Sequence, residues 1–235
     1  MNSMDLKSAR VTKGFSQVAA ARRLRVSQPY VAMLECGRRR LTPKLARRVM
    51  TVYGAPPTVV PLSGALTERY GPDELVKDVA ALGYPGFMYM SPRRWKPKNP
   101  AAVLLAALAN DDLESRLVEA LPWLLLRYST VDREWLVREA KLRDLQNRLG
   151  FVATLARRVA ERTGKQESVM AMRELEAKLE RSRLAREDTL CRKSLPDAER
   201  RWLKQHQSED AKHWNVLTDW TPDALRYAGS TSTLA

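Results

Sequence analysis

The stretch "RVSQPYVAMLECGRRR", residues 25–40, carries the signals of one short helix followed by three arginines. Ser27 can cap this helix, because a serine hydroxyl accepts a hydrogen bond from the free N–H groups of a first helical turn. Pro29 falls in that first turn, where its missing N–H removes no bond within the helix. Glycine, here Gly37, is the residue type that commonly follows a helix end. The sequence therefore predicts a helix from Ser27 to Gly37.

The predicted helix has two different faces. Val31 and Leu34 share the face that would point into a core. The opposite face, at steps of three and four residues, carries the candidate base-contacting residues Gln28, Pro29, Ala32 and Met33. The amide of Gln28 can both donate to and accept from an adenine edge, and Pro29 offers an apolar contact to a thymine methyl. This face is a candidate surface for reading a base sequence.

Further short helices surround this one. The pattern predicts helices over 5–13, 16–24 and 42–53. The segment "GAPPTVVPLSG", 54–64, then interrupts every helical period with its prolines and glycines. We therefore expect an N-terminal domain of four or five helices over residues 1–62.

Positive charge is concentrated in the same part of the chain. The 235 residues include 41 basic and 27 acidic side chains, a formal net charge of +14. Residues 1–54 hold 12 of the basic and 2 of the acidic ones, a net charge of +10, which leaves +4 for the rest. Such a local excess is what binding to a polyanion through counterion release requires. A basic face that is merely solvated is the alternative explanation.

Residues 5–54 resemble the Cro/C1-type helix-turn-helix family, also called XRE. The resemblance rests on spaced features: Ser16-Gln17 opening the second helix, Ala20 where two helices would cross, Val26-Ser27-Gln28 opening the third, and Glu35-x-Gly37-Arg38-Arg39 closing it. It implies a lambda repressor-like helical domain that binds double-stranded DNA. A domain that keeps this fold but no longer binds DNA is the alternative.

The resemblance also implies roles for individual residues. Arg10 would pair with Glu35 as a structural salt bridge. Contacts to DNA phosphates, which fix register without reading sequence, are expected from Ser16, Gln17, Arg25, Ser27, Tyr30, Arg38, Arg39 and Arg40. Arg25 departs from the family pattern, which usually has glycine in this turn. A non-glycine residue in the left-handed conformation costs roughly 1 kcal/mol, and we interpret Arg25 as an added phosphate contact.

Residues 63–100 are expected to form a linker and an ordered arm, with a short helix over 72–82. The part from 83 to 100 interleaves aromatic residues with cations: Tyr84, Phe87, Tyr89, Arg93, Arg94, Trp95, Lys96 and Lys98. Such a mixture can hold nucleic acid or clamp a protein partner. The interpretation we favour is that the aromatic residues fill the interface between two domains while the cations face solvent.

Residues 101–228 show helical periods and predict a larger helical bundle, followed by a polar tail at 229–235. The whole chain is thus expected to be all-α. The segment 112–128 is apolar on almost every side near its end and would form the bundle centre, with a kink at Pro122. The segment 131–164 is expected to be one long helix. Its apolar stripe would comprise Val131, Trp135, Leu142, Leu145, Leu149, Val152, Ala156 and Val159.

The last third of the chain leaves alternatives open. A helix over 166–190 has a narrow seam that would serve either bundle packing or a dimer contact, formed by Val169, Met172, Leu175 and Leu179. Shorter helices are expected at 197–207, 209–217 and 222–228. Four aromatic residues would finish the bundle or anchor a partner: Trp202, Trp214, Trp220 and Tyr227.

The sequence offers no pattern of a catalytic or metal site. Cys36 and Cys191 lie far apart and outside any Cys-x-x-Cys spacing, which favours free thiols and no zinc. His206 and His213 have no further ligand at metal-binding spacing, so a surface or packing role is favoured. No glycine-rich phosphate loop or nucleophile motif is present. We therefore expect a protein that is not an enzyme and uses no cofactor or metal.

These patterns lead to two hypotheses. The first is a sequence-specific transcriptional regulator, a repressor that binds a palindromic operator as a homodimer formed through its C-terminal part. In one version it is the antitoxin of a toxin–antitoxin operon, with a toxin bound by residues 101–228. The alternative is a protein-interaction module that neutralises or scaffolds a partner, with DNA binding secondary. Without a secretory pattern or an apolar run of roughly 18 residues, a cytoplasmic protein that does not enter a membrane is expected.

Overall fold

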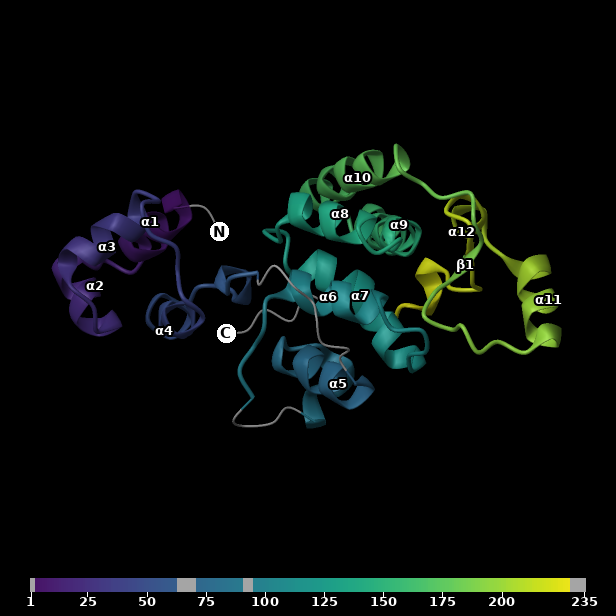
Figure 1. Cartoon of the computed structure of the whole chain (residues 1–235), viewed down its shortest axis with the longest axis horizontal. Coiled ribbons are helices and arrows are strands. Elements are labelled where there is room, and N and C mark those ends of the chain that lie inside the picture. The colour runs from purple at the N-terminus through teal and green to yellow at the C-terminus, as the bar shows by residue number, and fades with distance from the viewer. Residues whose placement is uncertain (1–2, 63–70, 91–94, 229–235) are drawn as a thin grey trace.

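The computed structural model describes residues 3–62, 71–90 and 95–228. Their regular secondary structure is almost entirely helical, which confirms the all-α class. They form an N-terminal domain (residues 3–62) and a larger C-terminal body (the described residues from 71 on), arranged along the long axis of the molecule (Figure 1). The expected tail at 229–235, and Arg93 and Arg94 of the expected arm, lie outside the described residues. Within those residues, no helix is both long and apolar enough to cross a membrane.

The N-terminal domain contains the expected short helices. They are α1 (Ser3–Thr12), α2 (Gln17–Leu24), α3 (Gln28–Glu35) and α4 (Pro43–Tyr53), followed by the 3-10 turn η1 (Pro57–Val59). The helices α2, α3 and α4 each begin after a side chain that accepts a hydrogen bond from the first turn: Ser16, Ser27 and Thr42. Their apolar residues, such as Leu24 and Val49, form one core that extends to Val60 beyond η1. The domain therefore ends with its core packed against the connection to the C-terminal body.

The C-terminal body is built around α7 (Ser115–Arg127). All residues from 117 to 125 are buried, and the helix continues through Pro122. Around it lie α5 (Pro72–Ala81), the 3-10 turn η2 (Pro85–Met90), α6 (Pro100–Leu108), α8 (Arg133–Lys141), α9 (Gln146–Arg162) and α10 (Gln166–Glu180). The central position expected for this segment is confirmed, because α7 packs on α5, α6 and α9.

The long helix expected over 131–164 is two helices, and that prediction was wrong. The chain reverses between α8 and α9, where Asp144 adopts the left-handed conformation with φ 56°. Aspartate tolerates this conformation better than most residues. Leu142, which was expected in the buried stripe, is 72% exposed at this break. The apolar spacing is therefore shared by two helices that bury different faces.

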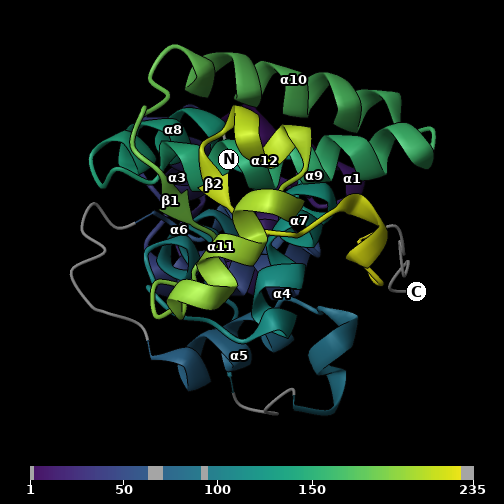
Figure 2. The same ribbon diagram turned by 90° about the vertical axis from the view of Figure 1, so that its right-hand side faces the viewer.

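The segments after α10 are shorter than expected. The helix predicted over 166–190 ends at Glu180, and the strand β1 (Asp188–Thr189) pairs in parallel with β2 (Val216–Leu217). Between them lie α11 (Asp197–His206) and α12 (Glu209–His213), and η3 (Pro222–Ala224) follows. The helices predicted at 209–217 and 222–228 are wrong in extent, because Asn215 takes a positive φ and Val216 is buried in the strand pair. Figure 2 shows these elements on the face of the C-terminal body opposite the N-terminal domain.

The apolar seam of α10 and most of the late aromatic residues belong to the interior of the body. All four seam residues, Val169, Met172, Leu175 and Leu179, are buried within this single chain, so they serve bundle packing. Trp214 is buried against α9, where its indole N–H donates to the hydroxyl of Thr154 at 2.8 Å. Trp220 and Tyr227 are partly buried against the same core, whereas Trp202 is exposed.

The expected arm also packs into the C-terminal body, which corrects the interpretation of its aromatic residues. Tyr84 and Phe87 are buried, and Tyr84 contacts the rings of Trp123 and Tyr227. They therefore fill the core of the body and not an interface between two domains. Of the other arm residues, Tyr89 is exposed, and the indole N–H of Trp95 donates to the carboxylate of Asp78 at 2.6 Å. Lys98 forms salt bridges with Asp78 at 3.0 Å and Glu74 at 2.6 Å, so the expectation that the cations only face solvent is wrong for this residue.

A small set of hydrogen bonds joins the N-terminal domain to the body. The side-chain amide of Asn99, at the start of α6, donates to the carbonyl oxygens of Thr58 at 3.1 Å and Val60 at 2.7 Å. Its oxygen accepts from the backbone N–H of Ala101 at 3.0 Å, which caps α6. The hydroxyls of Thr58 and Thr130 lie 3.1 Å apart. Asn99 is buried, so these bonds fix the connection where it enters the body.

Candidate nucleic-acid interface

The turn between α2 and α3 adopts the geometry that glycine usually supplies, but with Arg25 in the central position. Arg25 has φ 57° and ψ 51°, in the left-handed region. Backbone N–H groups in the turn donate to the last carbonyls of α2, including Val26 to Ala21 at 3.0 Å. The roughly 1 kcal/mol cost of this conformation is therefore present in the folded domain. The Arg25 side chain is exposed.

The first turn of α3 is held by its cap and presents its side chains to solvent. The hydroxyl oxygen of Ser27 accepts from the N–H of Tyr30 at 3.3 Å, and that of Ser16 accepts from the N–H of Ala19 at 3.1 Å. Both hydroxyl protons remain available as donors to a phosphate oxygen. Pro29 lies within this first turn, as expected.

The two faces of α3 are oriented as the sequence predicted. Val31 and Leu34 are buried in the core of the domain. The candidate base-contacting residues lie on the other side, with Gln28 and Pro29 exposed and Ala32 and Met33 half-buried. The structure thus brings all four onto one accessible surface at the start and middle of α3.

A chain of hydrogen bonds connects this surface to a buried ion pair. The Arg10 guanidinium donates to both carboxylate oxygens of Glu35, at 2.6 and 3.1 Å, and to the carbonyl of Phe15 at 2.6 Å. Glu35 also accepts from the amide of Gln17 at 3.0 Å, and the Gln17 oxygen accepts from the amide of Gln28 at 2.8 Å. Gln17, expected as a phosphate contact, therefore lies between the ion pair and the base-contacting surface, with one N–H left for a phosphate.

This series of hydrogen bonds orients the side chain of Gln28 and still leaves part of its amide free to contact a base. The amide nitrogen of Gln28 has two hydrogens, of which one is engaged with Gln17. The second hydrogen and the amide oxygen remain free to form the paired bonds that distinguish adenine in the major groove. Sequence reasoning identified Gln28 and Gln17 separately and missed the link between them, since no local pattern connects residues on different helices.

Arg10 and Glu35 form a buried ion pair in which each charge stabilises the other. The side chains of Arg10 and Glu35 are 9% and 4% exposed. Burial alone would raise the pKa of Glu35, but hydrogen bonds from Arg10 and Gln17 outweigh it and lower that pKa below its ordinary value. The hydrogen bond with Glu35 raises the pKa of Arg10. The predicted structural salt bridge is confirmed, and both groups stay charged near neutral pH.

The other cations of the N-terminal domain have no carboxylate partner among the described side chains. These are Lys7, Lys13, Arg22, Arg23, Arg25, Arg38, Arg39, Arg40, Lys44, Arg47 and Arg48. Two of them make other contacts: Arg48 donates to the carbonyl of Leu24 at 3.0 Å, and Arg23 lies 4.4 Å from the centre of the Phe15 ring. The remaining charge is free to attract a polyanion. The expected phosphate contacts Arg38 to Arg40 are all exposed, whereas Tyr30 is half-buried.

The two histidines and Cys191 lie in the C-terminal body, whereas the exposed free thiol of Cys36 follows α3 directly. His206 stacks on Trp202, with ring centres 4.1 Å apart, and the His213 ring nitrogen lies 2.7 Å from a carboxylate oxygen of Glu180. Burial raises the pKa of the Cys191 thiol to about 12, so it is protonated at neutral pH. In the described ranges, no cluster of three or more His, Cys, Asp or Glu residues could hold a metal ion.

Comparison with known proteins agrees with the geometry of the N-terminal domain. Residues 4–62 match a family described as a helix-turn-helix domain, of the Cro/C1 or XRE type. No curated protein and no solved structure matched the chain. Residues 4–62 therefore contain a helix-turn-helix domain, and this match does not extend into the C-terminal body.

Proposed function

We propose that the protein is a sequence-specific DNA-binding transcriptional regulator whose α3 enters the major groove. The observation that carries this proposal is the placement of Gln28 in the capped first turn of α3, held by Gln17 with one N–H and its oxygen still free. Helix-turn-helix proteins read base edges with the N-terminal residues of this helix. Pro29, Ala32 and Met33 then complete the apolar part of the base contact.

In this proposal, positioning and reading are done by different residues. Arg25, Arg39 and Arg40 are exposed cations around α3 and bind phosphates, which sets the register of the helix in the groove. Gln28 distinguishes one base from another. Loss of a phosphate contact should weaken binding to every duplex, whereas loss of Gln28 should remove a preference.

The test compares Gln28→Ala with Arg39→Ala in the full chain. A preferred duplex is first selected from a random pool with the wild-type protein, and affinities are then measured for that duplex and for a mixed-sequence one. We expect Gln28→Ala to lose roughly 1–3 kcal/mol of discrimination between the two duplexes, the worth of one bidentate base contact. Arg39→Ala should weaken both equally. Matched controls are Gln205→Ala and Arg201→Ala, because both residues are exposed on α11. Equal effects of Gln28→Ala on both duplexes would refute sequence reading.

We further propose that the protein is a cytoplasmic repressor that acts by binding and not by catalysis, as a homodimer on a palindromic operator. One α3 offers only four base-contacting residues, so a second copy would double the length of sequence that is read. Two recognition helices would then enter successive major grooves about 34 Å apart. Light scattering of the protein on duplexes with one or two half-sites tests this. Two chains should bind when the half-sites lie about one helical turn apart, and one chain per duplex at every spacing would contradict it.

A second candidate function is binding of a protein partner, including a toxin, by the C-terminal body. The observation that favours it is the run Met88, Tyr89 and Met90 in η2, three consecutive apolar side chains that are all exposed. If the protein is an antitoxin, co-expression should protect cells from the product of a neighbouring toxic gene. Protection should survive Gln28→Ala and be lost in Met88→Ser/Tyr89→Ser, with Met170→Ser on α10 as a control for another exposed methionine. Protection that depends on Gln28 and not on η2 would point to repression alone.

A further inference from the structure

A groove runs between the N-terminal domain and the C-terminal body, next to the arginine-rich loop that follows α3. One wall is formed by Gly37, Arg39 and Arg40 together with Leu6 and Leu34 from the apolar core of the domain, and the floor by residues 58–62. The opposite wall is formed by the start of α8, from Asp132 to Arg138. The groove has a volume of about 740 Å³. Figure 1 shows α6 and α8 on the side of the body nearest the N-terminal domain.

The two walls are fixed relative to each other through the floor. Thr58 and Val60, which line the groove, accept hydrogen bonds from the buried amide of Asn99 at the start of α6. Thr58 also contacts Thr130, two residues before α8 begins its cap at Asp132. The position of α8 relative to Arg39 and Arg40 is therefore fixed, so a ligand bound at these arginines would lie beside α8.

The charges that face the groove favour an anion. Arg39, Arg40 and Arg138 are positive, and Asp132 and Glu134 are negative. The carboxylate of Asp132 is already engaged as the cap of α8, because it accepts from the N–H of Trp135 at 2.9 Å. Glu134 lies at the exposed rim, 3.9 Å from the ammonium group of Lys178.

Among the described residues that line the groove, Arg138 is the cation that the body contributes. Its side chain is 64% exposed. Its nearest carboxylate, Glu139, lies 3.3 Å away but is bound more closely by Arg143, at 2.6 Å. One buried carboxylate thus faces two guanidinium groups, which leaves an excess positive charge at Arg138.

We propose that this groove holds the sugar-phosphate backbone of the DNA bound by α3, and that Arg138 contacts a phosphate from the side of the C-terminal body. This rests on the proposed function, since it assumes that the helix-turn-helix domain binds duplex DNA. It adds that the body is part of the DNA-binding surface and not only an attached domain. The ligand is a phosphodiester backbone, so the contact is independent of base sequence.

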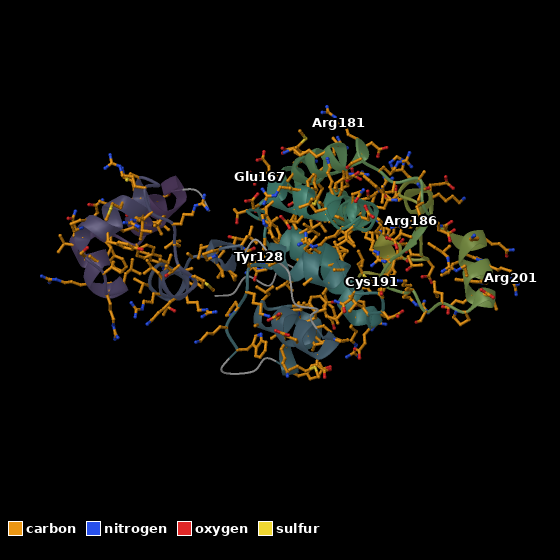
Figure 3. All side chains as sticks on the ribbon, in the orientation of Figure 1. Tyr128, Glu167, Arg181, Arg186, Cys191 and Arg201 are labelled. Atoms are coloured by element: carbon orange, nitrogen blue, oxygen red, sulfur yellow. The ribbon has the colours of Figure 1, made fainter. Side chains whose placement is uncertain are left out.

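The experiment measures binding of the full chain to a mixed-sequence duplex of about three helical turns over a range of salt concentrations. Arg138→Gln is compared with Arg201→Gln, the same change at an exposed arginine on α11. Figure 3 shows Arg201 at the end of the molecule far from the N-terminal domain. Each phosphate contact contributes a slope of about 0.9 to the salt dependence, which corresponds to roughly an eightfold change in affinity at about 0.1 M salt. We expect this loss and a slope lower by about 0.9 for Arg138→Gln, but almost no change for Arg201→Gln.

A position-specific readout separates contact from a general charge effect. A photo-crosslinker attached at Arg138→Cys, in a Cys36→Ser background, should label the duplex, and one attached at Arg201→Cys should not. If the wild type binds DNA but Arg138→Gln behaves like Arg201→Gln and the crosslink fails, this inference is overturned and the proposed function stands. If the wild type binds no duplex at all, the proposed function itself fails.

Discussion

The basic side chains of the N-terminal domain and those of the C-terminal body differ in whether they bind carboxylates of the same chain. Among the described side chains of the domain, Arg10 alone has a carboxylate partner. In the body, arginines bind carboxylates closely: Arg148 holds Asp188 through two bonds of 2.8 and 2.7 Å, and Arg157 binds Glu176 at 2.7 Å. Many arginines of the body thus bind carboxylates of the same chain, whereas the other cations of the domain form no salt bridge among the described side chains. Net charge alone would not distinguish these uses.

The largest effect we expect from this difference is on the stability of the body. Arg148 is buried and also donates to the carbonyls of Leu108 and Asn110. Arg148→Met would remove the guanidinium from Asp188 and from both carbonyls, leaving Asp188 only the backbone N–H of Thr189, and breaking such a buried pair costs about 3–5 kcal/mol. The measurement is the free energy of unfolding, read by hydrogen exchange in α7 and α9. Arg39→Met should change stability by no more than about 0.5 kcal/mol. Equal losses of stability for Arg148→Met and Arg39→Met would mean that arginines of the body and of the domain contribute alike to folding.

The ion pair of Arg10 with Glu35 should give a smaller, pH-dependent effect on the stability of the domain. The pKa of Glu35 is lowered in the folded domain, so its contribution to stability is complete above the unfolded pKa, near the ordinary value of 4.5. It is lost as pH falls below that value through the folded pKa. The protection factors of the α3 amides, which compare observed exchange with the intrinsic rate at the same pH, should therefore fall below pH 4.5, before those in the core of α7. Glu35→Gln should remove this pH dependence, and its persistence in that variant would assign it to another group.

Removing an exposed cation of the domain should change how DNA affinity depends on salt, whereas removing a cation paired with a carboxylate in the body should not. Arg39→Gln should weaken binding to any duplex roughly eightfold at about 0.1 M salt, with little difference near 1 M. Arg158→Gln, which removes a cation that binds Asp210 at 2.9 Å in the body, should leave DNA affinity unchanged. Fluorescence anisotropy at several salt concentrations checks both. A comparable loss in the two variants would show that DNA responds to total charge and not to its position.

The smallest effect concerns Arg25, where stability and binding should change in opposite directions. Arg25→Gly relieves the left-handed conformation at φ 57° and should stabilise the domain by up to about 1 kcal/mol. The same change removes the proposed phosphate contact and should weaken DNA binding. Arg25→Ala would remove the proposed phosphate contact but keep the left-handed conformation of a non-glycine residue. It therefore separates the effect on DNA binding from the effect on stability. A variant Arg25→Gly that binds DNA as well as the wild type would exclude Arg25 as a contact.

Local signals predicted some parts of the fold well. The caps at Ser16 and Ser27, the place of Pro29 in the first turn and the two faces of α3 follow from hydrogen bonding and spacing within a few residues. The break at Asp144 could not be predicted in this way, because the apolar spacing continues across it. The same holds for the burial of Tyr84 in the body, which depends on contacts with residues far away in the chain.

The sequence by itself determined the short N-terminal helices, their charge and the residues that the third helix exposes, because these depend on short-range periodicity and caps. Its resemblance to a known family indicated the helix-turn-helix domain. Only the tertiary structure decided which side chains of different helices, and of the domain and the body, lie next to one another. It linked Gln28 through Gln17 to the ion pair of Arg10 and Glu35. It also set Arg138 across a groove from Arg39, more than ninety residues earlier in the chain. Contacts of that kind depend on how whole helices pack, and no local pattern of residues specifies them.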